Sequence, residues 1–99
     1  MILGKVIGTV WSTRKDENLV GAKFLIVRQL DLNYKLQDNF VVAVDSVGAG
    51  VSEIVLVAQG SSARQTTITN NKPVDAVIMA IVDKLDISVK DKLEELIEG

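Results

Sequence analysis

Residues 22–32 read Ala-Lys-Phe-Leu-Ile-Val-Arg-Gln-Leu-Asp-Leu, and their side chains alternate in character. Such alternation indicates a β-strand with one buried face. The side predicted to face the core carries three large apolar residues, Phe24, Ile26 and Leu30. The opposite side carries polar residues, among them Lys23, Gln29 and Asp31. Because Leu25 and Val27 interrupt that polar side, we expect the second face to be partly covered as well.

A strand-like composition recurs along the rest of the chain. Strands are expected in four further segments, at residues 2–12, 40–44, 53–58 and 74–85. The polar loop Arg14–Val20, closed by Gly21, joins the first two strands, and Asn33–Asn39 is expected to be a turn-rich connection. Gly4 and Gly8 mark bends of the kind that curve a sheet. Five short strands predict an all-β fold, either a compact barrel or a sandwich.

Two short helices are expected in addition. Gly60–Gln65, between the fourth and fifth strands, can form one helical turn with a serine N-cap. Ser88 can cap a C-terminal helix that runs through Lys90–Glu98. The apolar stripe of that helix consists of Val89, Leu93, Leu96 and Ile97. So short a helix is marginal alone, so we separate a barrel domain, 1–87, from a helical tail, 88–99.

The chain is more apolar than a domain of its size requires. It has 99 residues, of which 47% are hydrophobic and only 4% aromatic, and its mean hydropathy is +0.27. A domain this small buries only about 60–65% of the surface that its unfolded chain exposes. We expect the surplus of aliphatic side chains to cover contacts with neighbouring subunits. The alternative is a monomer whose barrel is merely well filled.

The composition argues against an enzyme, and we expect no catalytic, metal or cofactor site. Histidine is absent, so the usual proton shuttle at neutral pH and the commonest metal ligand are missing. Cysteine is absent too, which excludes disulfides and thiolate metal sites. The net charge is −2 and the 11 basic residues are scattered, so no stripe that would follow nucleic-acid phosphates is evident.

The sequence also lacks a signal for export or membrane insertion. Its N-terminus does not combine a basic region with the apolar core of a signal peptide. The longest apolar run, Ala76–Val82, is far shorter than the ~20 residues that cross a bilayer. We therefore expect a soluble, cytoplasmic protein with no membrane partner.

Two segments of small residues could be mistaken for ligand sites. Gly48-Ala49-Gly50 suggests a phosphate loop, but Glu53 stands where the dinucleotide pattern needs its third glycine, and the P-loop ending is missing. We interpret the segment as a tight turn that needs positive φ or close backbone approach. Ser61 and Ser62 follow Gly60, but without histidine the common catalytic triads are excluded, so cap and turn roles are expected.

Neither the carboxylates nor the aromatic residues define a stronger site. The candidate carboxylates are Asp45, Glu53, Asp75 and Asp83. Each stands beside or within a strand, so we expect hydrogen bonds to the backbone or pairing with Arg64 rather than cation binding. The four aromatic residues are Trp11, Phe24, Tyr34 and Phe40, a poor platform for stacking bases on an acidic domain. An OB-type module that binds single-stranded nucleic acid or another ligand is the alternative to an assembly role.

Five segments, in this order and at similar spacing, resemble the EutN/CcmL family of bacterial microcompartment shell vertex proteins. They are Gly4–Val10, Leu19–Leu25, Ala43–Gly50, Gly60–Arg64 and Pro73–Ala76. The resemblance spans roughly positions 1–87; within it, Ser52 stands where many members have glycine. It implies a five-stranded OB-like barrel that assembles into a homo-pentamer. Such pentamers plug the vertices of a carboxysome-like shell, where they meet hexameric shell proteins.

The resemblance also implies where subunits meet. The residues expected near the ring interface or axial pore are Ser46, Val47, Gly48, Ala49 and Gly50, together with Ser61, Ser62, Ala63 and Arg64. The small residues of the first group would let neighbouring backbones approach. Gly60–Arg64 would be the short helix, with Arg64 bonding across or beneath it. Because a five-fold ring is a head-to-tail assembly, each subunit must present two different surfaces.

Overall fold

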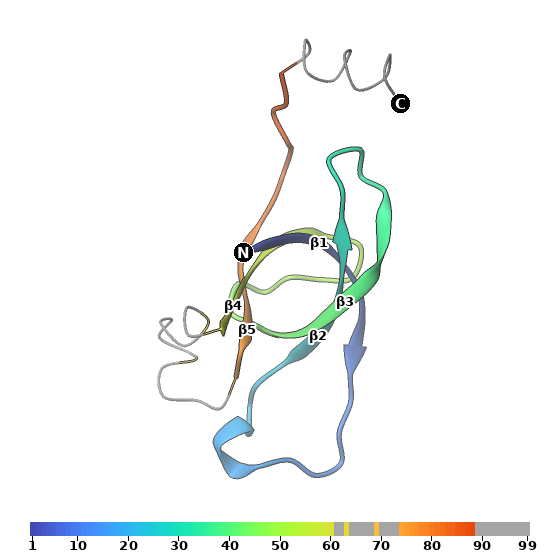
Figure 1. The fold of residues 1–99 in the computed structure, drawn as a ribbon. Helices are drawn as coiled ribbons and strands as arrows, with labels where there is room; N and C mark the ends of the chain where they lie inside the picture. The colour runs from blue at the N-terminus through green and yellow to red at the C-terminus, as the bar shows by residue number, and fades with distance from the viewer. Residues whose placement is uncertain (61–62, 64–68, 70–73, 89–99) are drawn as a thin grey trace.

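The computed structural model describes residues 1–60, 63, 69 and 74–88. The strands within them are β1 (Ile2–Val10), β2 (Phe24–Leu30), β3 (Leu36–Asp45), β4 (Ile54–Gln59) and β5 (Ala76–Ile81). A 3-10 helix, η1 (Glu17–Leu19), lies in the loop between β1 and β2 (Figure 1). The helix expected between β4 and β5, and the one expected at the C-terminus, fall largely outside the described residues.

The strands close into a barrel in the order β1-β2-β3-β5-β4. Neighbouring strands are antiparallel except β3 and β5, which run parallel where Val44 pairs with Val77 and Asp45 with Ile78. β4 is bonded to β1 and β5, so it lies across the barrel from the seam between β2 and β3. The prediction of an all-β, five-stranded barrel is confirmed.

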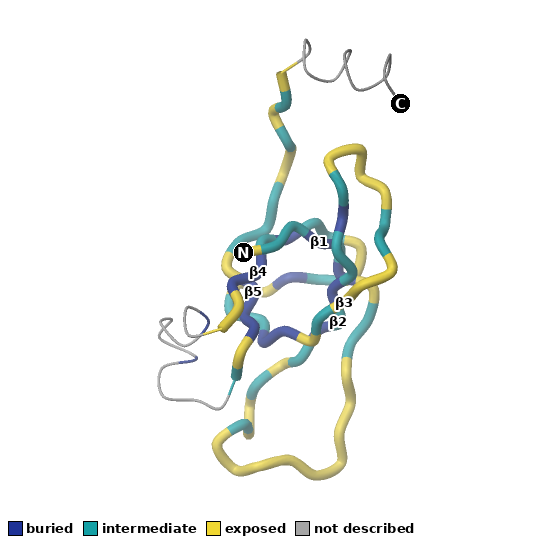
Figure 2. The backbone as a smooth tube through the Cα atoms, viewed as in Figure 1, coloured by how far each residue is buried: buried dark blue, intermediate teal, exposed yellow. Residues whose placement is uncertain are grey.

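Aliphatic side chains fill the barrel interior (Figure 2). The main core cluster consists of Val6, Leu25, Val27, Ala43, Ala49, Val55, Val57, Ala76 and Ile78. A smaller cluster consists of Val44, Ala58, Ala63 and Val77. Because side chains alternate along a strand, this smaller cluster covers the outer side of the wall formed by β3, β4 and β5. Complete burial of each large aliphatic side chain contributes about 1.5–3 kcal/mol.

The buried face of β2 is not the one that alternation in the sequence predicted. Leu25 and Val27 are 1% and 0% exposed and point into the barrel, whereas Phe24 and Ile26 are only partly buried. Leu30 is buried as well, because the pairing of β2 with β3 shifts at an irregularity just before it. One extra residue in a strand reverses the facing of all residues beyond it. The prediction of Phe24, Ile26 and Leu30 as a single core face is therefore wrong.

The hairpin between β2 and β3 is tighter than predicted. β3 already begins at Leu36, so the expectation of a connection over Asn33–Asn39 is wrong for its second half. The Asp31 carboxylate organises the turn, since its Oδ1 accepts the backbone N–H groups of Asn33 at 2.8 Å and Lys35 at 3.0 Å. The hydrogen bond from Lys35 and, less strongly, that from Asn33 lower the pKa of Asp31.

β5 is shorter than predicted. It ends at Ile81 because β4 offers no partner beyond that point, so the expected strand over 74–85 is too long. Residues 82–88 continue as a chain that joins no strand ladder within the described residues (Figure 1). The backbone N–H of Leu85 donates a hydrogen bond of 3.1 Å to the hydroxyl of Tyr34. This bond ties the segment to the tip of the β2–β3 hairpin.

The loop between β1 and β2 projects from one end of the barrel (Figure 1). Asp16 caps η1, because its carboxylate accepts the N–H of Asn18 at 2.9 Å. Gly21 has φ +87°, a conformation that residues with a Cβ rarely adopt. The predicted hairpin loop, closed by Gly21, is thereby confirmed.

Candidate functional site

The loop after β3 is organised around the carboxylate of Asp45. Its Oδ1 atom accepts hydrogen bonds from the backbone N–H groups of Val47, Gly48 and Ala49, each at 3.1 Å. Gly48 has φ +76°, so the prediction of a conformationally demanding glycine turn is confirmed. The N–H groups that could have cradled a phosphate are bonded instead to a carboxylate of the protein itself.

A second carboxylate closes the same loop. Glu53 Oε1 accepts the N–H of Gly50 at 2.7 Å, and the carbonyl of Glu53 accepts the N–H of Val6 at 3.0 Å. The loop is therefore tied to β1 as well as to β3. The predicted role of Asp45 and Glu53 as acceptors for backbone groups is confirmed, and this role accounts for both side chains without acid–base chemistry.

The predicted interface segment Ser46–Gly50 divides between core and surface. The hydroxyl of Ser46 donates a hydrogen bond of 2.5 Å to the carbonyl of Ile78. Ala49 is 1% exposed and belongs to the main core cluster, whereas Val47 is 39% exposed. The methyl group of Ala49 thus faces the barrel interior, and the surface that this loop offers to a neighbour consists of Val47 and Gly48.

The second predicted segment, Gly60–Arg64, is described only in part. Gly60 has φ +67°, and its N–H donates to the carbonyl of Asp75 at 2.8 Å. Ala63 is fully buried in the smaller cluster, which also contains Val77. The three remaining residues, Ser61, Ser62 and Arg64, lie outside the described residues. The two predicted segments therefore meet neighbouring positions of β5, one through Ser46 and the other through Ala63.

The part of the chain that the structure describes holds no cluster of at least three aspartate or glutamate side chains that could bind a metal ion. Asp75 contributes its backbone carbonyl to the fold, and Asp83 is exposed after the end of β5. No helix within the described ranges is long and apolar enough to span a bilayer.

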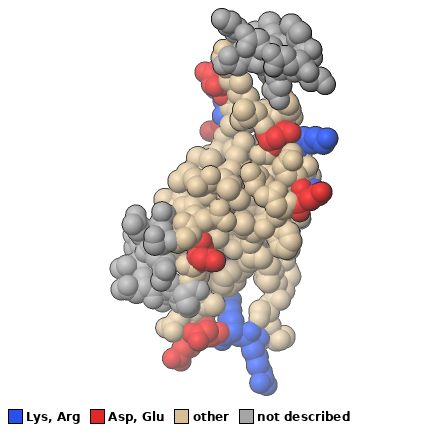
Figure 3. Space-filling model, viewed as in Figure 1, with Lys and Arg blue, Asp and Glu red and all other residues tan. Residues whose placement is uncertain are grey.

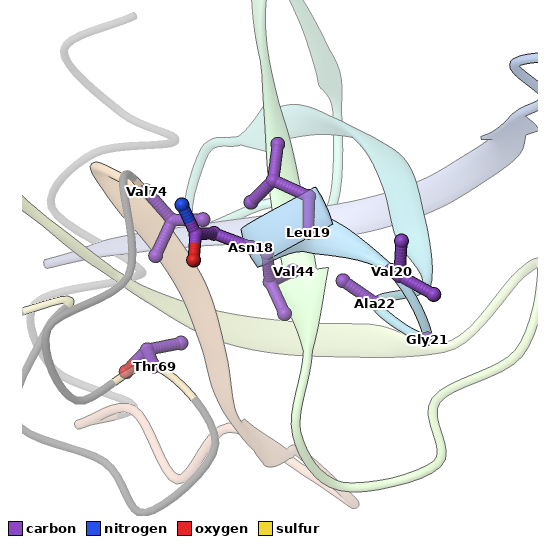
Figure 4. Close-up of a pocket in the computed structure, with 8 residues that line it drawn as sticks. All are labelled: Asn18, Leu19, Val20, Gly21, Ala22, Val44, Thr69 and Val74. Atoms are coloured by element: carbon purple, nitrogen blue, oxygen red, sulfur yellow. The ribbon is translucent and has the colours of Figure 1, made fainter. Parts of the chain in front are cut away.

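A hollow of about 210 Å³ lies between the β1–β2 loop and the residue before β5 (Figure 4). Its lining residues are Asn18, Leu19, Val20, Gly21, Ala22, Val44, Thr69 and Val74. None of these side chains is ionisable, so they supply neither a general acid nor a general base. The hollow is chemically suited to an apolar group.

The aromatic side chains lie on separate elements rather than on one platform. Trp11, in the β1–β2 loop, is 89% exposed, while Tyr34 lies at the hairpin tip and Phe40 on β3. The ring of Phe24 faces Lys15, whose Nζ is 5.6 Å from the ring centroid. On the face shown in Figure 3, a broad uncharged area separates scattered acidic and basic side chains. This arrangement does not favour a nucleic-acid site.

The outer wall of the barrel is the surface that the sequence pattern located least well. Strand register places two rows on it, Val10, Phe24 and Val44 in one and Gly8, Ile26 and Val42 in the next. Phe40 and Val42 are 60% and 42% exposed. An antiparallel sheet commonly presents polar residues on the face that meets water. An apolar outer face is typical instead of a surface that another subunit covers.

Comparison with known proteins agrees with this architecture. The family model described as ethanolamine utilisation protein EutN/carboxysome matches residues 1–83. The chain belongs to the EutN/CcmL family. A EutN/CcmL relative, the carboxysome shell vertex protein CcmL of Synechococcus elongatus, is 45% identical over 97 residues, which cover 95% of this chain and 98% of that protein.

Solved EutN/CcmL structures share the fold. CcmL of Gloeobacter violaceus has a TM-score of 0.84 and 41% identity, covering 88% of this chain and 90% of that one. The GrpN pentameric microcompartment shell protein of Rhodospirillum rubrum has a TM-score of 0.81 and 46% identity, covering 89% and 100%. These EutN/CcmL relatives are named for a structural place in a shell and not for a reaction.

Proposed function

We propose that this EutN/CcmL chain is a structural shell protein, five copies of which form a ring at a vertex of a bacterial microcompartment. The observation that carries the proposal is the 46% identity and TM-score of 0.81 to the pentameric shell protein GrpN. The apolar outer wall supplies the physical reason for assembly, because its burial between subunits removes that surface from water.

Hexameric shell proteins are the proposed partners of the ring at its edges. Six-sided units tile a flat layer, and a layer made only of such units does not close. Five-sided units introduce the curvature that closure requires. The protein therefore works in the cytoplasm as part of a protein shell, without nucleic acid, membrane or cofactor.

The loop Ser46–Gly50 and the segment Gly60–Arg64 are proposed to lie near the ring interface or its axis. The exposure of Val47 beside the buried Ala49 supports this for the loop. A charge at Val47 then weakens the ring, whereas a bulky residue at Ala49 strains the barrel itself. We also propose that the barrel domain, 1–87, carries the ring contacts, since the family match ends at residue 83, before the tail at 88–99.

Two measurements test the function. The native mass of the purified protein is expected to equal five chains. Electron microscopy of a hexameric shell protein produced with and without this chain is expected to show closed shells only when the chain is present. Equal closure in its absence would contradict the vertex role. Titration with single-stranded oligonucleotides at low salt is expected to show no binding, and saturable binding would favour the OB-type module instead.

A further inference from the structure

Two apolar surfaces lie on different sides of the barrel. The first, called the groove face here, is formed by Phe24, Phe40, Val42, Val44 and Val74. A hollow of about 230 Å³ lies in it, lined by Phe24, Val42, Val44, Val74, Asp75 and Ala76. Phe40 and Val42 expose 60% and 42% of their surface beside this hollow. The groove face is therefore both apolar and concave.

The second surface, called the wall face, is formed by Leu3, Ile54, Leu56 and Met79. Leu3 pairs directly with Leu56 across β1 and β4, and alternation turns both away from buried Val55. Met79 is 40% exposed where the pairing of β4 with β5 shifts. The wall face thus presents aliphatic side chains with no hollow among its named residues.

Resting on the pentamer proposed above, we propose that the groove face of one copy packs against the wall face of the next copy. A ring closed by rotation joins two different surfaces, one from each neighbour. The barrel order meets this requirement, because β4 lies across the barrel from the seam of β2 and β3. Groove-to-groove packing would instead close after two copies.

The charges at the two faces complement one another. Asp75 is the ionisable residue among those lining the hollow, and it is exposed. Lys5 borders the wall face, since it pairs with Ile54 on the outward side of β1. An acidic rim thus meets a basic rim when the faces dock, which favours this register over two like-charged rims.

The test uses one charged substitution in each face of the full-length protein. Val42→Glu blocks the groove face and Met79→Glu blocks the wall face; both positions are at least 40% exposed in the single chain. Each variant alone is expected to lose the ring, with subunit association weakened by about 30-fold or more, as for a hot-spot residue. An equal mixture is expected to form dimers of one copy of each variant, because one intact groove face then meets one intact wall face.

Native mass spectrometry distinguishes the outcomes, and circular dichroism confirms folding. Leu32→Glu is the matched control, since Leu32 is 58% exposed at the hairpin tip and outside both faces, and its ring is expected to persist. Phe40→Glu and Leu56→Glu replace either variant that fails to fold. Rings formed by both variants, or a mixture without dimers, would overturn the assignment of the faces. Failure of the unmodified protein to form a ring would instead overturn the proposed function.

Discussion

The hydroxyl of Ser46 donates a hydrogen bond of 2.5 Å to the backbone carbonyl of Ile78, which joins the loop after β3 to the middle of β5. The parallel pairing of β3 and β5 extends only over Val44–Val77 and Asp45–Ile78. The side chain of Ser46 therefore reinforces the shortest seam of the barrel. The fold of the single chain and the shape of the proposed interface loop depend on the same contact.

Replacing Ser46 by alanine is expected to lower the free energy of unfolding by about 1–2 kcal/mol, because the partly buried carbonyl of Ile78 loses its donor. The urea midpoint of the variant measures this loss. Ser12→Ala is the matched control, since the hydroxyl of Ser12 bonds to the carbonyl of Arg14 in an exposed loop. The Ser46 contact is not structural if both variants unfold at the same urea concentration.

The Asp45 carboxylate tests how much the glycine turn depends on a single acceptor. Asp45→Ala leaves three backbone N–H groups without their bond and is expected to cost about 2–3 kcal/mol. Asp45→Asn keeps an oxygen acceptor and is expected to cost less than Asp45→Ala. Asp38→Ala serves as the control, because Asp38 is exposed and only 3.9 Å from Arg28. Equal stability of the Asp45 and Asp38 alanine variants in urea would argue against this account of the loop.

Two glycines of β1 predict opposite responses to the same change. A Cβ on Gly4 would lie 2.4 Å from Val27 Cγ1 and 2.8 Å from the carbonyl oxygen of Arg28, so Gly4→Ala is expected to cost about 1–3 kcal/mol. A Cβ on Gly8 would meet only Ile26 Cδ1, at 3.7 Å. Gly8→Ala is therefore expected to be neutral, or to stabilise by up to ~1 kcal/mol. Thermal unfolding of both variants checks the order, and a greater loss at Gly8 would contradict it.

Asp31 predicts a pH dependence of the β2–β3 hairpin. Its pKa is lowered from 3.8 by the backbone N–H of Lys35 first and by that of Asn33 less strongly. A carboxyl group whose pKa is depressed by folding contributes stability above 3.8, and loses it as the pH falls through the folded value. The effect is small because Asp31 is solvent-screened. NMR titration should place the Asp31 midpoint below 3.8, and its acid-dependent loss of stability should vanish in Asp31→Asn. A midpoint at or above 3.8 would contradict the prediction.

Part of the fold and of the candidate site could be predicted because it depends on neighbouring residues. The strand around residues 24–30 follows from local side-chain preference, and the loop closed by Gly21 follows from turn chemistry. The turn at Gly48 could be predicted for the same reason, and so could the use of Asp45 as a backbone acceptor. The candidate interface was predictable only as a surplus of aliphatic residues, because composition does not say on which side of a strand they lie.

By itself, the sequence determined five strands in order, a glycine turn without ligand chemistry, and a chain too apolar to stay alone. Only the tertiary structure decided that Leu25 and Val27, rather than Phe24 and Ile26, fill the barrel. It also decided that β3 begins at Leu36 and that β5 ends at Ile81. The reason is that register, bulges and strand ends depend on pairing with distant strands, and a shift of one residue exchanges the inner and outer faces.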